Sequence, residues 1–274
     1  MADAESGDSE VSVPSAEELT ELFKFPVPPA LVTAIQSLAK AAEDDWEQAW
    51  ELLTGQSIWP VARYNSTPPE LFSVCGPGMD GIHAGPVIHD IRFGPEFPWA
   101  EFCPADSDGC FKLGNNTMEA IEGLASRQIV ELEDEDELEL FHTYAKAVGI
   151  TPAKEKAVGG TNWGAKGMRP PCERPTYNIP AGWRHVPLDD GLGVLAPADT
   201  FAPGDIVLTD DQDVAALVAE ATKHHADGHY GSALVLLRHA NWINTDDVTQ
   251  PIKETYRALG RDLLADAMDT YARR

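Results

Sequence analysis

Apolar residues recur at helical spacing in the first part of the chain and predict three helices there. The first is expected to begin near Ser15, because SAEE forms a capping box in which Glu18 follows the capping serine by three residues. The second is expected from about Pro29, since proline is tolerated at the first position of a helix. The third follows the acidic pair at 44–45, and its Trp46 and Trp50 are interpreted as core residues.

From about residue 66 the pattern changes to short alternating runs between prolines and glycines, which is typical of strands and turns. IHAGPVIHDIRF is predicted to be extended. EFPWAEFCPADSDGCFKLG is predicted to form two strands joined by the turn ADSDG. A helix is expected next, with Asn116 as its N-cap and Glu119 completing a capping box.

The run ELEDEDELELF at 131–141 combines a block of like charge with an apolar stripe. Leu138, Phe141, Tyr144 and Val148 keep helical spacing through and beyond it, so the segment is predicted to be a helix packed on one side. Its free face would be an acidic ridge made of Glu131, Glu133, Asp134, Glu135, Asp136, Glu137 and Glu139. A solvated helix face and a binding surface both fit this pattern.

Residues 150–205 are rich in glycine and proline and carry little periodicity. GWRHVPLDDGLGVLAP is the one convincing hairpin in this region, and AKEKAVGGTNWGAKGMRPP is the best candidate for a mobile loop. The chain then becomes helical again, with two helices broken at Asp227–Gly228 and a last helix whose apolar stripe runs from Ile252 to Tyr271. GHYGSAL resembles the turn between the helices of a tetratricopeptide repeat, but a plain helical hairpin is the interpretation we prefer, because one and a half repeats cannot form a solenoid.

The net charge of −25 is concentrated in the first half of the chain. Residues 1–140 hold 28 acidic against 6 basic residues, a net charge of −22, whereas residues 141–274 hold 17 against 14, a net charge of −3. Such a field repels nucleic acid and anionic membranes and speeds encounter with basic partners. Solubility is the simpler explanation of the same charge.

A chain of 274 residues can fold without a disulfide or a metal. No apolar stretch approaches the ~20 residues needed to span a bilayer, and MADAESGDSEVSVPS has neither the basic nor the apolar region of a secretory signal. The four cysteines include no CxxC pair, as expected in a reducing compartment. We therefore expect a cytoplasmic protein whose residues 1–14 form a disordered acidic tail.

The stretch CGPGMDGIHAGPVIHD gathers side chains that often serve as metal ligands. His83 and His89 are six residues apart, which is ~20 Å in an extended strand, so they could share an ion only if Gly85–Pro86 formed a hairpin corner. We interpret the stretch as the first turn and strand of a sheet, with both histidines at its edge or surface. A metal-dependent hydrolase using them with Asp80 or Asp90 is a further hypothesis.

A second histidine group consists of His224, His225 and His229. Residues at i and i+4 meet on one face of a helix, but Gly228 intervenes as the expected helix break. Packing between helices or exposure is the interpretation we prefer. No motif in the chain defines a reaction class, so we predict no enzyme activity, no catalytic residue, no metal site and no cofactor.

The middle of the chain resembles the SUKH superfamily, which holds bacterial toxin-immunity proteins and fungal cell-wall assembly regulators. The resemblance rests on TPPELFSVCGPGMDGIHAG, with its Gly/Asp turn, and on the closing strand and helix in ADSDGCFKLGNNTMEAIEGLAS, and it spans about residues 15–148. The histidines of HAGPVIHD, the glycine- and proline-rich insertion and the helical C-terminus depart from the family pattern.

The resemblance implies an α+β fold, an antiparallel sheet flanked by helices, over residues 15–205 with an insertion near 150–180. A helical hairpin or short helical bundle at 206–274 would follow. The resemblance also implies an immunity or regulatory protein that covers a partner's surface. The acidic ridge suggests a protein partner with a basic surface, of which a toxin is one candidate, rather than nucleic acid or membrane. A scaffold acting through the C-terminal helices, around Tyr230 and Tyr256, is the alternative.

Overall fold

The computed structural model describes residues 13–42, 45–60, 63–64, 66–76, 81–104, 109–158, 173–204, 206–209, 212–243 and 248–271. The helices are α1 (Ala16–Phe23), α2 (Pro29–Ala41), α3 (Trp46–Thr54), α4 (Thr117–Gln128), α5 (Glu135–Val148), α6 (Val214–Ala226), α7 (Tyr230–Ile243), α8 (Thr249–Ala258) and α9 (Asp262–Ala267). The strands are β1 (His83–Pro86), β2 (Trp99–Phe102), β3 (Cys110–Gly114), β4 (Trp183–Val186) and β5 (Val194–Pro197). Short 3-10 turns are η2 (Ile91–Phe93), η3 (Lys154–Lys156), η5 (Ala198–Thr200) and η6 (Met268–Tyr271). The predicted α+β class is therefore confirmed.

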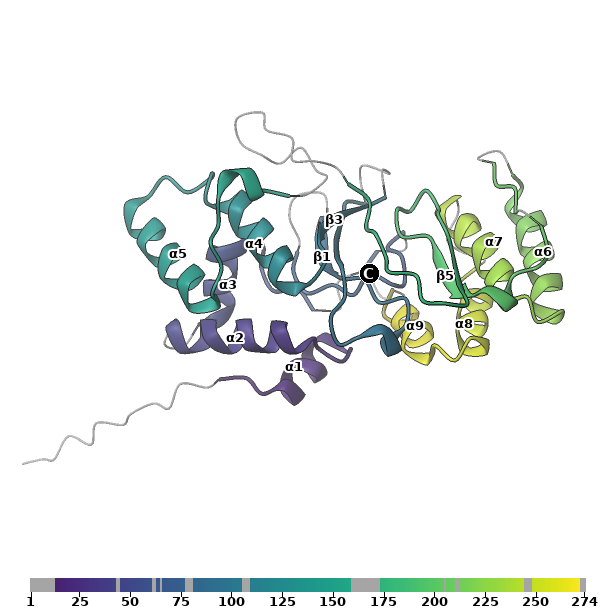
Figure 1. Cartoon of the computed structure of the whole chain (residues 1–274), viewed down its shortest axis with the longest axis horizontal. Helices are drawn as coiled ribbons and strands as arrows, with labels where there is room; N and C mark the ends of the chain where they lie inside the picture. The colour runs from purple at the N-terminus through teal and green to yellow at the C-terminus, as the bar shows by residue number, and fades with distance from the viewer. Residues whose placement is uncertain are drawn as a thin grey trace, which may run out of the picture.

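Two small antiparallel sheets lie between two groups of helices (Figure 1). The first sheet has the order β1-β2-β3, and Phe102 of β2 lies opposite both His83 and Cys110. The second pairs β4 with β5 and confirms the hairpin predicted in GWRHVPLDDGLGVLAP. In Figure 1, α2 to α5 lie on one side of the sheets and α6 to α9 on the other.

The predicted helix starts are confirmed by their caps. Ser15 and Glu18 form the reciprocal capping box of α1, and proline stands at the first position of α2. Asn116 accepts a hydrogen bond from the backbone N–H of Glu119 and so caps α4, but the predicted capping box is not formed, because the Glu119 carboxylate accepts from the backbone N–H of Asn115 instead. These local bonds satisfy backbone donors that a helix cannot satisfy by itself, which is why the sequence identifies the starts correctly.

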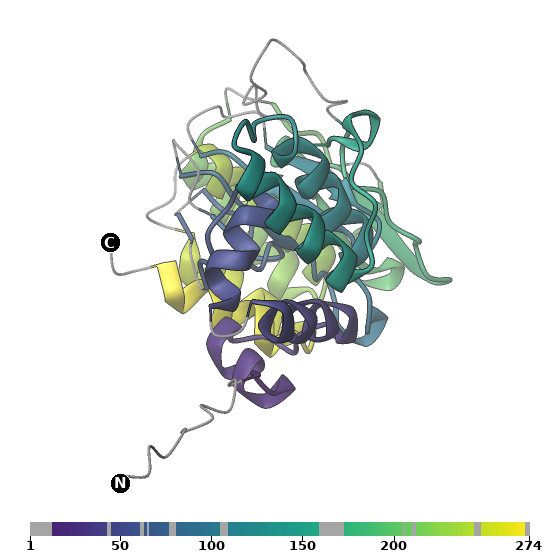
Figure 2. The ribbon, with the colours of Figure 1, turned by 90° about the vertical axis from the view of Figure 1, so that its left-hand side faces the viewer.

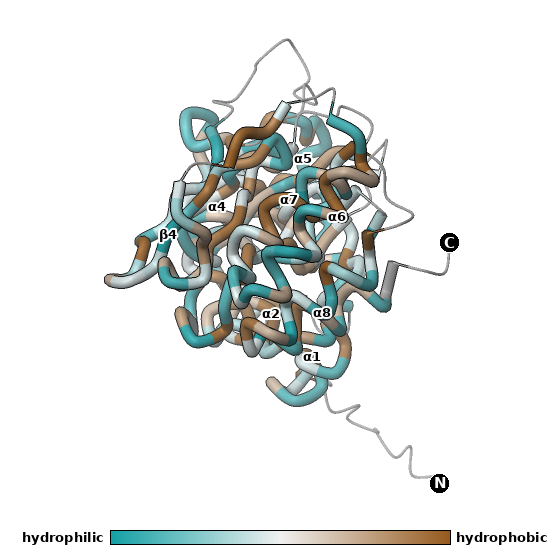
Figure 3. The backbone as a smooth tube through the Cα atoms, turned by 90° about the vertical axis from the view of Figure 1, so that its right-hand side faces the viewer, coloured by the Kyte–Doolittle hydropathy of each residue, from teal (hydrophilic) through white to brown (hydrophobic). Residues whose placement is uncertain are grey.

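Helix α7 is buried on all sides and centres the C-terminal part. Every residue from 231 to 241 is buried, and the helix packs against α6, α8 and β5. Figure 3 looks onto this end of the molecule, with α6, α7 and α8 facing the viewer. A helix buried all round belongs to a protein core, so the C-terminal helices form a packed unit around α7.

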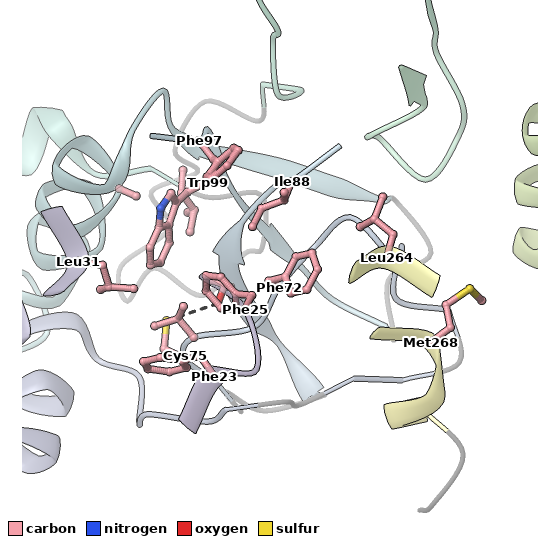
Figure 4. Packing of buried hydrophobic residues seen from close by; sticks show 14 of the residues in the cluster. Phe23, Phe25, Leu31, Phe72, Cys75, Ile88, Phe97, Trp99, Leu264 and Met268 are labelled. Atoms are coloured by element: carbon pink, nitrogen blue, oxygen red, sulfur yellow. Dashed lines mark hydrogen bonds between the residues drawn. The ribbon is translucent and has the colours of Figure 1, made fainter. Parts of the chain in front are cut away.

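One hydrophobic core connects the N-terminal helices, the first sheet and the C-terminal helices. Figure 4 shows Phe23 and Leu31 from α1 and α2 on one side of the β1–β3 region, and Leu264 and Met268 from the C-terminal end on the other. Of the two tryptophans predicted to be core residues, Trp50 is fully buried, whereas Trp46 is only partly buried and packs against the core from outside. The apolar residues of distant segments therefore share one interior.

The last predicted helix is wrong in its length. The stripe from Ile252 to Tyr271 is divided between α8, α9 and η6, and the break lies at Gly260, whose φ is +69°. A left-handed residue after the last turn ends a helix, and glycine adopts it without steric cost. The break turns Arg261 into the protein interior, where its side chain is buried.

Some predictions fall outside the described residues. They are the tail up to residue 12, the turn at 105–108, and residues 159–172 of the glycine- and proline-rich insertion. Within the described residues, no helix is long and apolar enough to cross a membrane.

Strand β1 requires glycine at position 85. The segment 71–75 runs beside β1, with Phe72 donating its backbone N–H to Pro86 and Val74 donating to Ala84. A Cβ at Gly85 would lie 1.8 Å from the carbonyl oxygen of Phe72, which is backbone and cannot rotate away. The glycine therefore permits a backbone approach that no other residue allows.

We expect Gly85→Ala to lower the free energy of unfolding by at least ~3 kcal/mol, because overpacking against backbone must displace the strand. Gly182→Ala is the control: Gly182 has a φ of +80° with nothing near its Cβ position, so only ~1–2 kcal/mol of backbone strain is expected. Urea unfolding of the full chain measures both. Equal losses in the two variants would contradict the steric argument.

Candidate functional site

The acidic ridge lies at the start of α5 and on its outer surface. All seven predicted residues, Glu131, Glu133, Asp134, Glu135, Asp136, Glu137 and Glu139, are exposed. Asp134 is the N-cap and accepts hydrogen bonds from the N–H groups of Asp136 and Glu137 at 2.9 and 3.1 Å. Negative charge is favourable in the first turn of a helix, so the ridge also stabilises α5.

Packing on the opposite face holds α5 in place. Phe141 and Ala145 are buried where the helix packs on α2 and α3, which confirms the predicted one-sided packing. Figure 2 faces this side of the molecule, with α5 (teal) at the front. The acidic residues are thus carried by a fixed helix.

The exposed side of α5 is not uniformly acidic. Glu135, Leu138, Glu139, His142, Thr143 and Lys146 line a shallow groove along it. Leu140 is 47% exposed and lies within the run of acidic residues. Apolar side chains among the charges offer a partner apolar area to bury, in addition to the electrostatic attraction of the carboxylates.

His83 lies on β1, the end strand of the first sheet, as one part of the prediction had it, but its predicted surface position is wrong. His83 is fully buried in β1, where its Nδ1–H donates to the carbonyl of Gly81 at 2.8 Å and its Nε2 accepts from the hydroxyl of Thr67 at 3.0 Å. Because both ring nitrogens have partners, the neutral ring can be buried at little cost. Burial lowers the pKa of His83 to about 4.

His89 is also buried, in different surroundings. Its ring lies edge-on to Tyr177 at 4.6 Å between centroids, and its Nδ1 is 3.8 Å from Oε1 of Glu70. Burial lowers its pKa well below the usual value, and the positive charge of Arg261 acts in the same direction. The interpretation of His89 as an edge or surface residue is therefore wrong as well.

The histidines of this stretch do not converge on one point. Gly85–Pro86 lies within β1 and forms no hairpin corner, and Asp90 instead caps η2 and pairs with Arg92. Asp80 lies outside the described residues. Among the described residues no group of three or more His, Cys, Asp or Glu side chains could hold a metal ion, and this includes His224, His225 and His229.

The cysteines of the described part are free thiols, as predicted for Cys103 and Cys110. Cys75, Cys103 and Cys110 are all buried, and burial raises the pKa of Cys75 and of Cys110. A thiol with a raised pKa is a poor nucleophile. Cys172 lies outside the described residues.

A buried polar cluster, absent from the sequence predictions, joins the two halves of the chain. We call it the junction cluster; it consists of Glu70, His89, Tyr177, Asp190, Arg238, Tyr256 and Arg261. Its members come from the segment around β1, the residues before β4, the β4–β5 turn, α7, α8 and the turn between α8 and α9. No local sequence pattern brings such distant residues together.

Arg238 is the centre of the junction cluster. One arm of its guanidinium binds Glu70 and the other binds Asp190, and both carboxylates are buried. Tyr256 donates its hydroxyl to Glu70 at 2.6 Å and accepts from Arg238 at 3.0 Å. Asp190 also accepts the N–H groups of Leu192 and Gly193 at 2.9 and 2.8 Å. This connectivity satisfies the ions that burial would otherwise destabilise.

Arg261 completes the cluster from beyond the break after α8. Its guanidinium donates to the carbonyl of Leu195, lies over the ring of Trp183 and is 3.7 Å from the carboxylate of Asp90. Its Nε and Nη1 make no hydrogen bond within the described part of the chain, and the same holds for both ring nitrogens of His89. The polar groups of Arg261 and His89 therefore have fewer hydrogen-bond partners than those around Arg238.

One sequence signal could have found the centre of the cluster. Arg238 interrupts ALVLLRHANW, which otherwise reads as an apolar helix. A charge within such a run predicts a buried ion pair, because arginine is almost never buried without a partner. No local pattern in the sequence identifies the acidic residues that pair with Arg238.

Comparison of the sequence with protein-family profiles finds no matching family, and comparison with curated proteins finds no match.

We expect Arg238→Met to lower the free energy of unfolding by about 3–5 kcal/mol, because Glu70 and Asp190 would remain buried without their cation. Arg257→Met is the matched control: Arg257 is exposed and pairs with Asp266 at 3.2 Å, so a change below ~1 kcal/mol is expected. Urea unfolding compares the two. A loss below 1 kcal/mol in Arg238→Met would show that the cluster contributes little to stability.

His83 predicts a pH dependence of stability. It is neutral in the folded protein down to about pH 4, whereas in the unfolded chain it binds a proton below about pH 6.5. Stability is therefore lost as the pH falls from 6.5 towards 4, by ~1.4 kcal/mol per pH unit from this residue. Urea unfolding at pH 7, 6 and 5 should show a shallower pH dependence in His83→Gln than in the wild type. The exposed His142→Gln should match the wild type.

Proposed function

We propose that this chain is a non-enzymatic binding protein that uses the acidic ridge of α5 to cover the basic surface of a protein partner. The observation that carries the proposal is the placement of seven exposed carboxylates at one end of a helix whose opposite face is packed into the core. The chain holds them ready in one geometry, so binding does not have to order the helix that presents them.

The charge of the first half supports the same proposal. A net charge of −22 on residues 1–140 steers basic partners towards the ridge and repels nucleic acid and anionic membranes. Leu138 and Leu140 add apolar area between the charges, which gives a partner more than screened Coulomb contact. Within this proposal the partner presents lysines or arginines around an apolar centre.

The SUKH resemblance adds the class of binding protein. The α+β fold, with a small antiparallel sheet between helices, agrees with what that resemblance implies. We propose on this basis an immunity or regulatory role, with a toxin as one candidate partner. The resemblance itself rests on the sequence motifs alone.

The two other hypotheses lose support. Of the two residues singled out for a scaffold acting through the C-terminal helices, Tyr256 is fully buried in the junction cluster and only Tyr230 is partly exposed. A hydrolase using His83, His89 and Asp90 requires side chains that meet, whereas His83 and His89 occupy separate environments and Asp90 pairs with Arg92.

Charge reversal on the ridge tests the proposal. We expect Glu135→Lys/Asp136→Lys/Glu139→Lys to abolish retention of a partner from native lysate at low salt, whereas the wild type retains it at low salt and releases it at high salt. The measurement is a pull-down of the tagged full chain with mass spectrometry of the retained proteins.

Glu220→Lys/Asp227→Lys/Glu254→Lys is the matched control, because it reverses three exposed acids of the C-terminal helices and changes the net charge equally. It should retain the partner. Equal retention by both triple variants would contradict the proposal, and selective loss in the control would favour the C-terminal scaffold.

A further inference from the structure

We propose that α8 and α9 form a pH-sensitive cover over the junction cluster, which opens when His89 takes up a proton. The cover is the C-terminal end of the described chain, and it contributes Tyr256 and Arg261 to the cluster. This inference is independent of the acidic ridge, which lies on α5 at the other side of the sheets (Figure 1).

His89 is enclosed by charged and titratable groups from every element packed around it. Glu70 faces it from the segment before β1, Tyr177 and His185 from the chain before β4 and from β4 itself, and Asp190 from the β4–β5 turn. Arg238 approaches from α7 and Arg261 from the turn after α8. The two arginines and His185 oppose a proton on His89, whereas Glu70 and Asp190 favour it, and burial opposes it most.

The closed cover keeps His89 neutral for a geometric reason. With 3% of its surface exposed and both ring nitrogens unpartnered within the described residues, the ring has no acceptor aligned to hold a proton, and the nearest carboxylate oxygen is 3.8 Å away. Hydrating the ring requires one wall of the enclosure to move. The proton is therefore taken up in the open state in preference to the closed one.

The wall formed by α8 and α9 is better able to move than α7. Helix α8 has an exposed outer face that includes Glu254 and Arg257, whereas α7, which supplies Arg238, is buried on all sides. Two nitrogen atoms of Arg261, Nε and Nη1, make no hydrogen bond to the described residues. Opening would let water bond to them, which lowers the free-energy cost of opening. Outer segments of folded proteins open locally at lower free energy than global unfolding.

Opening would separate Tyr256 from Glu70 and Arg261 from Asp90 and Leu195. The apolar contacts of Leu264 and Met268 with the core would be lost at the same time (Figure 4). The open state therefore presents Glu70, His89 and an apolar surface that the closed state hides.

Linkage sets the size of the effect. If the ordinary histidine pKa of about 6.5 applies in the open state, the opening equilibrium rises about tenfold between pH 7.5 and pH 5.5. Amide hydrogen exchange of the full chain, corrected for the intrinsic exchange rate at each pH, measures this rise in the amides of α8 and α9. We expect their protection to fall about tenfold, and an unchanged protection would overturn the proposal.

Two histidine variants separate this local switch from general acid sensitivity. His89→Gln should remove the pH dependence of exchange in α8 and α9. His83→Gln removes the other buried histidine of the β1 region and should leave that dependence in place. If His89→Gln keeps the tenfold change, or if His83→Gln abolishes it, the proposal is wrong.

If His89→Gln does not fold, amide exchange of the wild type still tests the proposal. The amides of α2 and α4, which lie outside the cover, then serve as the internal reference. The proposal requires that α8 and α9 open without them. An identical pH dependence in α2, α4, α8 and α9 would indicate global unfolding and would overturn it.

Discussion

The arrangement of the molecule depends on one buried arginine with two carboxylates. Arg238 projects from the most buried helix and binds Glu70 from the segment before β1 and Asp190 from the β4–β5 turn. Buried ions contribute little net stability as a set, but removing one of them leaves the others unpaired at high cost. The cluster therefore selects one way of joining the first sheet, the second sheet and the C-terminal helices, because any other packing would bury uncompensated charge.

The acidic residues of this protein fall into two physical classes. Glu70 and Asp190 are inside, paired and hydrogen-bonded, and they act on the fold. The residues of the acidic ridge are outside, solvated, and supported by the helix that presents them. Composition counts both classes together in the net charge of −25, although only the exposed class creates a field that a partner can sense. We accordingly propose a binding surface on the exposed side of α5 and a pH-sensitive switch in the interior around His89.

Predictions from local pattern succeeded where local bonds decide the structure. The caps at Ser15 and Asn116, the break at Gly228 and the hairpin before Pro197 each involve residues only a few positions apart. Predictions that concerned burial of polar side chains failed. His83 and His89 lie in a stretch with the composition of an exposed turn, yet both are buried, because Thr67, Gly81 and the junction cluster surround them in space.

The sequence by itself determined the starts of α1 to α4, the β4–β5 hairpin, the α+β class, the one-sided packing of α5 and the exposure of the acidic ridge, since these follow from capping, periodicity and charge within short windows. Only the tertiary structure decided that Gly260 turns Arg261 inwards, that Tyr256 is buried, and that Arg238 meets two carboxylates from distant segments. The physical reason is the distance along the chain over which each interaction acts. Periodicity and caps act over a few residues, whereas the partner of a buried charge is chosen by the packing of the whole chain.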